Sequence, residues 1–134
     1  RPEAMNVADG KMILPIFHII SRDQWALAQA AGAHRGDTLD SEGFIHCSTA
    51  EQVLLPANAL FRGRTDLLLL CIDAGKVQPE IRYEQSGDLF FPHIYGPLNV
   101  DAVVNVVDFP PSADGTYSLP RGVGSEQSTV NSER

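Results

Sequence analysis

Apolar residues gather in short runs that predict β-strands. The segments 12–20 and 66–73 contain long apolar stretches, as in strands that are covered on both faces. The first stretch is interrupted by His18, and the second runs from Leu67 to Ile72. We expect the first of them to lie inside its sheet. Shorter β-rich runs at 44–47, 80–84 and 102–109 predict three further strands.

Helical spacing follows the first run. Ser21 and Gln24 form a capping box, in which Ser21 is the N-cap and Gln24 stands at the third helical position. Apolar residues then repeat at helical intervals as far as Ala31. Gly32 can adopt the left-handed conformation that ends many helices. The pattern therefore predicts a helix between Ser21 and Gly32.

A second helix is predicted after the strand at 44–47. Ser48 or Thr49 would cap it, with Gln52 placed to reciprocate, and Gly63 would end it. Pro56 falls inside this segment and removes a backbone donor. The helix must therefore bend there or begin again with Pro56 in a first turn.

The remaining segments read as connections. Residues 33–42 predict a polar connection and 85–88 a turn. The aromatic segment 90–97 contains two prolines and predicts a rigid loop that packs on the core or lines a pocket.

Helices that come early and strands that come late indicate an α+β fold. The chain of 134 residues is long enough for one domain, which we place at 12–109. Residues 1–11 are predicted to be a flexible lead-in and 110–134 a largely disordered tail, rich in Ser, Gly and Pro. Tyr117 and Leu119 are apolar enough to hold a short return segment on the core.

The composition of the chain argues against some classes of binding partner. A formal net charge of −7 makes nucleic acid and anionic membranes poor partners, because both need basic surfaces. The apolar runs are shorter than the roughly 20 residues that span a bilayer. No secretory leader pattern is visible, so we expect a cytoplasmic protein. Cys47 and Cys71 lie in apolar strands and predict buried thiols, although sequence leaves a disulfide open.

Three of the four histidines lie in apolar segments that resemble strands: His18, His46 and His93. A buried imidazole must find a hydrogen-bond partner or lose free energy. Three such residues together predict a shared pocket. His34 lies among glycines and acidic residues, and we expect it to be exposed to solvent.

Strand alternation places His46 and Ser48 on the face of Phe44, with Cys47 on the opposite face. This alternation argues against one metal ion bound by both His46 and Cys47, and metal-ligand spacing such as paired Cys-x-x-Cys is absent. No metal site is predicted. A helix is expected directly after the strands of His18 and His46, and helix N-termini favour phosphate or another anion.

Glu84 and Tyr95 complete the candidate chemistry. Glu84 offers a carboxylate at a strand end, although an edge strand with its charges in water explains that residue equally well. Tyr95 stands two residues after His93. Because rigid loops often carry function, we expect the histidine and this tyrosine to line the pocket.

The histidine motifs resemble a bacterial family of small proteins, domain-of-unknown-function family 952, over about residues 12–109. The motifs that carry the resemblance are Phe17-His18-Ile19, Glu42-Gly43-Phe44-Ile45-His46-Cys47-Ser48, Gln52, Arg62-Gly63-Arg64-Thr65-Asp66-Leu67 and Phe91-Pro92-His93-Ile94-Tyr95-Gly96-Pro97-Leu98.

This resemblance implies a fold similar to the ADP-ribosyltransferases, in which a split, mainly antiparallel sheet arrangement clamps NAD in a cleft. The resemblance matches His18 to the first-strand histidine, His46 and Ser48 to the second motif, and Glu84 or His93 to the third. Ile19 stands where a glycine often follows the first histidine, which affects the usual contact with the nicotinamide amide.

We therefore expect a histidine-lined pocket for NAD or an ADP-ribose derivative. Glu84 and His93 would be catalytic, and His18, His46, Ser48 and Tyr95 would bind the ligand. NAD would be a substrate, and no cofactor is required. The alternatives are an inactive ligand-binding or accessory module, a histidine-dependent phosphoesterase, and a purely structural role for the histidines. The oligomeric state is left open.

Overall fold

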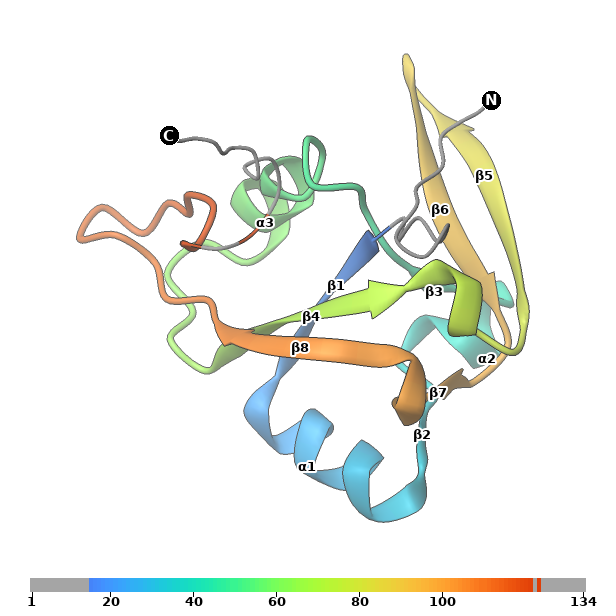
Figure 1. Ribbon diagram of the computed structural model, residues 1–134. Coiled ribbons are helices and arrows are strands. Elements are labelled where there is room, and N and C mark those ends of the chain that lie inside the picture. The colour runs from blue at the N-terminus through green and yellow to red at the C-terminus, as the bar shows by residue number, and fades with distance from the viewer. Residues whose placement is uncertain (1–14, 122, 124–134) are drawn as a thin grey trace, which may run out of the picture.

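The computed structural model describes residues 15–121 and 123, and it shows an α+β fold built on antiparallel sheets (Figure 1). The predicted flexible lead-in, 1–11, lies outside the described residues. The same holds for 124–134 of the predicted tail.

The main sheet contains β1 (Pro15–Ser21), β4 (Leu67–Asp73) and β8 (Val103–Asp108), in the order β1-β4-β8. Its central strand is β4, which explains why all its residues from Leu67 to Ile72 are buried. The expectation that the first strand is internal is wrong, because β1 lies at the edge. A single β-bridge, from Phe17 to Ser48, covers its outer side.

The second sheet has the order β3-β6-β5, from β3 (Ile45–His46), β6 (Leu89–Tyr95) and β5 (Glu80–Ser86). A two-residue turn with Gly87 at φ 63° connects β5 to β6, as hairpin turns of this length require. The rigid loop expected at 90–97 is wrong, since most of it is strand β6. Pro92 is tolerated there, and its carbonyl accepts the N–H of Cys47 at 3.1 Å.

The polar connection expected at 33–42 is also wrong. It contains β2 (Ala33–His34), which pairs with β7 (Leu98–Asn99), and the short helix α2 (Thr38–Glu42). The hydroxyl of Thr38 donates to the Phe44 carbonyl at 2.6 Å and closes this segment on itself. Local side-chain bonds of this kind are invisible to apolar periodicity.

Helix α1 (Arg22–Ala31) confirms the first predicted helix. The Ser21 side chain accepts from the Gln24 N–H at 3.1 Å, and Gly32 ends the helix at φ 86°. None of the helices in the described ranges is long and apolar enough to cross a membrane.

The second helix, α3 (Leu54–Leu60), begins later than predicted. Ser48 cannot cap it because its backbone N–H and C=O are both bonded to Phe17, at 2.8 and 2.7 Å. The expected contact of Gln52 with Thr49 is present, since the Gln52 side chain accepts from the Thr49 N–H at 3.1 Å, but it lies in a turn before the helix. Pro56 then lies in the first turn of α3, as one of the two expectations had it.

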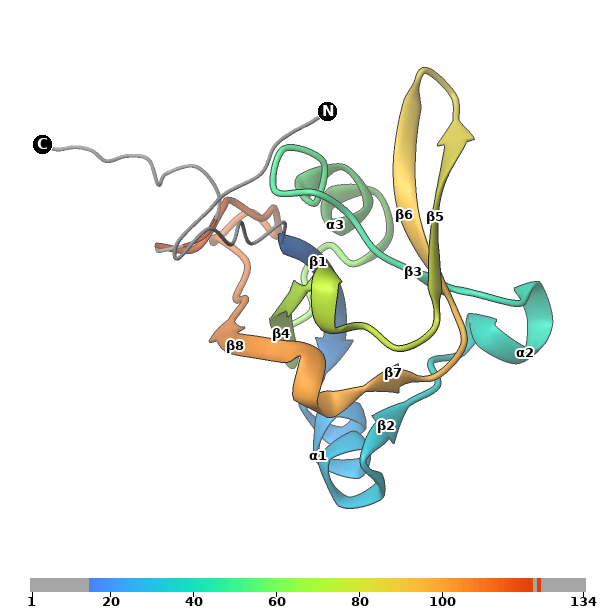
Figure 2. The same ribbon diagram turned by 45° about the vertical axis from the view of Figure 1, so that its right-hand side comes forward.

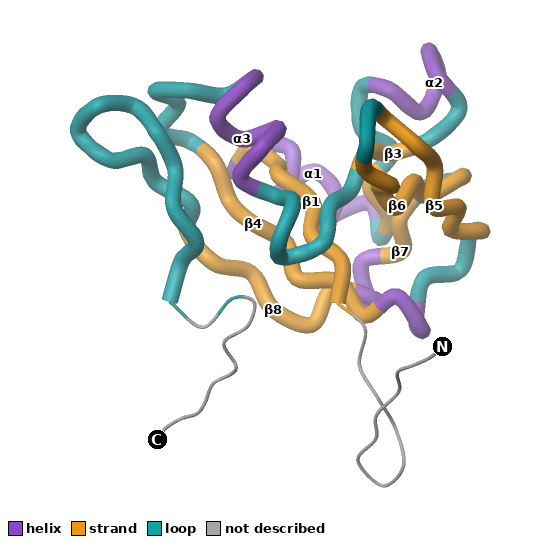
Figure 3. The backbone as a smooth tube through the Cα atoms, turned by 90° about the horizontal axis from the view of Figure 1, so that it is seen from above, coloured by secondary structure: helices purple, strands orange, loops and turns teal. Residues whose placement is uncertain are grey.

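Alternate residues of the main sheet feed two apolar clusters on its opposite faces. One face packs against β3, β6 and β7, and the other against α3 and the segment after β8. Two short 3-10 helices, Ala74–Lys76 and Val100–Ala102, close the chain around the first cluster. Figure 2 shows α1 and α3 at opposite ends of the molecule, and Figures 2 and 3 both show the hairpin of β5 and β6 beside the main sheet.

Packing continues past residue 109, where we expected the domain to end. Tyr117 is buried, and its ring stacks on Phe109 with centroids 4.8 Å apart. The Tyr117 hydroxyl lies 2.7 Å from the Phe61 carbonyl oxygen and 2.8 Å from that of Arg64. The segment after β8 therefore holds the loop that follows α3.

Replacing Tyr117 with Phe should lower the free energy of unfolding by about 1 to 2 kcal/mol, because two partly buried carbonyls lose their shared donor. Urea denaturation measures the change. Tyr83→Phe is the control, since the Tyr83 side chain is 52% exposed. Equal effects of the two substitutions would contradict the role given to the Tyr117 hydroxyl.

Candidate functional site

All four histidines of the chain line one open cleft with a volume of about 1060 Å³. They come from four different strands: His18 from β1, His34 from β2, His46 from β3 and His93 from β6. Residues of both larger sheets and of α3 form the walls. The structure therefore brings together the three histidines singled out in the sequence, and Ser48 with them.

Both ring nitrogens of His18 have protein partners. Its Nδ1 lies 2.7 Å from the His46 carbonyl oxygen, and its Nε2 lies 3.2 Å from the Nε2 of His34. A carbonyl only accepts, so the Nδ1 of His18 carries the proton. Burial, and to a lesser degree the neighbouring His34, lower the pKa of His18 to about 4. The ring is therefore neutral near pH 7.

His34 is buried, so the expectation that it is exposed to solvent is wrong. Strand β2 pairs with β7 and turns the ring inward. Gly36, at φ 72°, allows the next loop to pass close by: a Cβ there would lie 3.4 Å from the Nε2 of His34. Burial lowers the pKa of His34, and the charge of Asp37 partly offsets this effect.

His46 is more open to solvent, with a side chain 53% exposed. Its Nε2 lies 2.9 Å from a carboxylate oxygen of Glu42, at the end of α2. The Phe44 ring packs beside it, with centroids 4.8 Å apart. Ile45 and Cys47 are buried on the opposite face, which confirms the predicted alternation.

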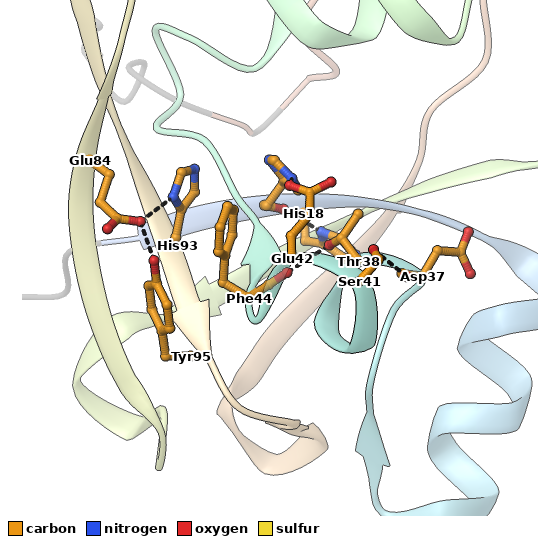
Figure 4. Close-up of polar contacts among 10 residues, drawn as sticks. His18, Asp37, Thr38, Ser41, Glu42, Phe44, Glu84, His93 and Tyr95 are labelled. Carbon is orange, nitrogen blue, oxygen red and sulfur yellow. Dashed lines mark hydrogen bonds and ion pairs between the residues drawn. The ribbon is translucent and has the colours of Figure 1, made fainter.

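His93 is held by an acid and an aromatic ring. Its Nδ1 lies 2.7 Å from Glu84 Oε1, and the Tyr95 hydroxyl donates to the same oxygen at 2.6 Å (Figure 4). Phe44 stacks on the His93 ring, with centroids 4.1 Å apart and planes 15° apart. The bonds from Tyr95 and His93 hold the pKa of Glu84 below its usual range. The network leaves the other nitrogen of His93 directed away from Glu84.

Glu84 and Tyr95 are not among the residues that line the cleft. They contact His93 and thereby orient its ring, while Glu42 is the glutamate of the lining. The histidine rings of the two neighbouring strands, His46 and His93, have centroids 5.2 Å apart. The site thus contains two imidazole–carboxylate pairs on adjacent strands.

Sequence reasoning missed His34 and Glu42. The spacing of apolar residues did not predict their positions, because each lies in a short element next to a glycine. The spacing of four between Glu42 and His46 resembles a helical pair, yet Gly43 ends the helix between them at φ 91°. Only the tertiary path of the chain brings the two together.

Polar groups at the other end of the cleft are partly engaged. Ser21 and Gln24 line the cleft at the start of α1, where the Ser21 hydroxyl already caps the helix. Arg64 lines it as well and binds Asp66 through two nitrogens, at 3.0 and 2.8 Å. The second helix, α3, begins at Leu54 and not directly after the strand of His46. The expectation of a helix N-terminus that binds an anion next to His46 is therefore wrong.

Within residues 15–121 and 123, no three His, Cys, Asp or Glu side chains are grouped so that they could hold a metal ion. Cys47 and Cys71 are buried free thiols, which resolves the alternative left open by the sequence. Burial raises the pKa of the Cys47 thiol, so it is a poor nucleophile at neutral pH.

The protein thus has an α+β fold with four histidines in one cleft. The chain belongs to the family described as a protein of unknown function (DUF952), whose model matches residues 19–106, as the resemblance predicted.

The structure is similar to that of protein CC0527 from Caulobacter crescentus. In its crystal structure, that protein shares 36% sequence identity with this chain at a TM-score of 0.73, and the match covers 78% of this chain and 93% of the other. In its solution NMR structure, the sequence identity is 38% and the TM-score 0.68, and the match covers 78% of this chain and 91% of the other. No curated protein matches the chain.

Acid should destabilise the protein through His18. Between its ordinary pKa of 6.5 and the folded value of about 4, the unfolded chain binds the proton and the folded chain does not. Stability therefore falls as the pH drops through this window, by up to about 3 kcal/mol from this residue.

Urea denaturation of the wild type and of His18→Asn across this pH window tests the prediction. The substituted protein should be less stable at neutral pH and should lose less stability on acidification. Parallel pH profiles for the two proteins would show that His18 titrates at its ordinary value.

Proposed function

We propose that the cleft binds a nucleotide of the ADP-ribose type, and that the protein transfers ADP-ribose from NAD to water or another acceptor. The convergence of four imidazoles from four strands on one cleft carries this proposal. An open cleft with several convergent polar groups is the usual form of a small-molecule site.

The lining matches the chemistry of a dinucleotide. The imidazoles of His46 and His93 suit ribose hydroxyls, and the Arg64 guanidinium, which also binds Asp66, suits a phosphate. Aromatic rings suit stacked bases, and Phe44, Phe61 and Phe91 are all part of the lining. The formal charge of −7 does not oppose this, because a bound nucleotide meets only the local groups.

The arrangement of the sheets also supports the proposal. Residues of the β1 sheet and of the β3 sheet both line the cleft, and both sheets are antiparallel. Two antiparallel sheets around a cleft are what the resemblance to the ADP-ribosyltransferases implies. The likeness to that superfamily is part of the proposal and is tested with it.

In the proposed reaction, the bond between the ribose C1′ and the nicotinamide nitrogen breaks, and its electron pair leaves with nicotinamide. Positive charge develops on the ribose, and a nearby carboxylate stabilises it. Glu42, which lines the cleft, would provide this carboxylate. Water or an acceptor hydroxyl attacks C1′ and gives its proton to the Nε2 of His93. Glu84 accepts the Nδ1–H of His93 and holds the ring for this step.

Binding can be measured by NMR titration with NAD or ADP-ribose at millimolar concentration. Histidine ring signals of His46 and His93 should shift, and His93→Ala should weaken binding by about tenfold, the loss of one hydrogen bond to a polar ligand. AMP and inorganic phosphate serve as matched ligands that lack the second ribose. Unchanged histidine signals would contradict the proposal.

Turnover separates an enzyme from a binding module. Glu84→Gln should lower nicotinamide release from NAD on the order of 10²-fold, because a general base loses its orienting partner. Glu80→Gln is the matched control, since Glu80 lies on the same strand and pairs with Arg82 at the surface.

Two outcomes would replace the proposal with its alternatives. Ligand binding without turnover, equal in wild type and Glu84→Gln, would favour an inactive binding or accessory module. Cleavage of a cyclic phosphodiester that is lost in His46→Ala, with no reaction on NAD, would favour the phosphoesterase.

A further inference from the structure

We propose that His34 is a positioning residue of the cleft. Its Nε2–H donates to the bare Nε2 of His18, whose tautomer the His46 carbonyl sets, and so holds the His18 ring in place. His18 in turn donates to the backbone of His46 and fixes the strand from which the His46 ring projects. The inference concerns the protein without ligand, and only its consequence for binding rests on the proposed function.

The direction of the hydrogen bonds follows from the acceptor at the end of the chain. The His46 carbonyl oxygen only accepts, so His18 must donate from Nδ1 across 2.7 Å. A neutral His18 then has a bare Nε2. The contact of 3.2 Å between the two Nε2 atoms therefore requires the proton on His34. The rings lie with centroids 5.1 Å apart, tilted by 47°.

The surrounding charges favour this arrangement. Burial, and after it the rings of His34 and His46, disfavour a charge on His18. Burial also lowers the pKa of His34, but the charge of Asp37 partly offsets this effect there. A proton added to His34 leaves its Nε2–H donor in place, whereas a proton added to Nε2 of His18 destroys the acceptor.

The pair also links three sheets of the fold through side-chain contacts. His34 belongs to the β2-β7 sheet, His18 to the main sheet and His46 to the third sheet. Because both nitrogens of His18 are engaged, its ring supports the cleft wall, and a ligand meets the nitrogens of His46 and His93 instead. His34 therefore acts on the ligand through His18 and His46.

The wild-type protein alone can decide the tautomer. Two-bond nitrogen–proton NMR correlations of labelled histidine at neutral pH distinguish a protonated ring nitrogen from a bare one. We expect His18 to carry its proton on Nδ1 with a bare Nε2, and His34 to carry a proton on Nε2. A His18 ring protonated on Nε2, or a His34 ring with a bare Nε2, would overturn the inference.

Two substitutions separate positioning from simple packing. His34→Leu replaces the ring with an apolar side chain and removes the donor, so the nitrogen chemical shift of His18 Nε2 should change and the pKa of His18 should rise. His34→Gln keeps an amide N–H that can reach His18, and should restore the wild-type shift and pKa. If both variants keep the wild-type Nε2 shift and pKa of His18, His34 does not position it.

ADP-ribose affinity gives the functional consequence. It should fall by about tenfold in His34→Leu and recover in His34→Gln, as the loss of one ordering hydrogen bond implies. Failure of the wild type to bind ADP-ribose would refute the proposed function alone, because the tautomer of His18 is measured without ligand.

Discussion

A hydrogen-bonded chain from His34 through His18 to the His46 carbonyl is the constraint on which the cleft depends. It has one direction, because it ends on an acceptor that cannot donate. It joins three sheets that share few backbone bonds, apart from the bridge between Phe17 and Ser48. Burial keeps His18 neutral and so keeps the chain intact. The core packs the sheets together, and these polar contacts hold the rings of His18 and His34 in place at its edge.

Much of the fold could be predicted from local signals. The capping box at Ser21 predicts only a helix start and the unbroken apolar run of β4 only a buried strand, and the structure agrees with both. The two elements that the sequence predicted wrongly, β6 and the start of α3, have a common cause. Strand β6 is hidden by Pro92, and the second helix starts late because β1 occupies the backbone of Ser48. In both cases a distant segment provides the bonds, and propensity contains no information about distant segments.

The candidate site, like the fold, could be predicted only as far as local sequence signals reach. The three histidines in apolar segments do meet, because a buried imidazole needs a partner and a cleft between strands provides one. The positions of the acids could not be foreseen. The sequence predicts Glu84 as a catalytic carboxylate of the pocket, whereas the register of β5 and β6 places it against His93, outside the cleft lining. Sequence identified the strands and faces, while pairing register and chain path decided which groups touch.

The hairpin turn at Gly87 has a consequence for how the family can vary. In the ladder Glu84 lies opposite Phe91 and Arg82 opposite His93, so the acid and the imidazole are diagonal neighbours on one face. A slip of one residue would send every side chain of one strand to the other face. An insertion of one residue at this tip would thus separate the pair without touching either member. The length of an exposed turn, remote from the cleft floor, is therefore part of what a functional relative must keep.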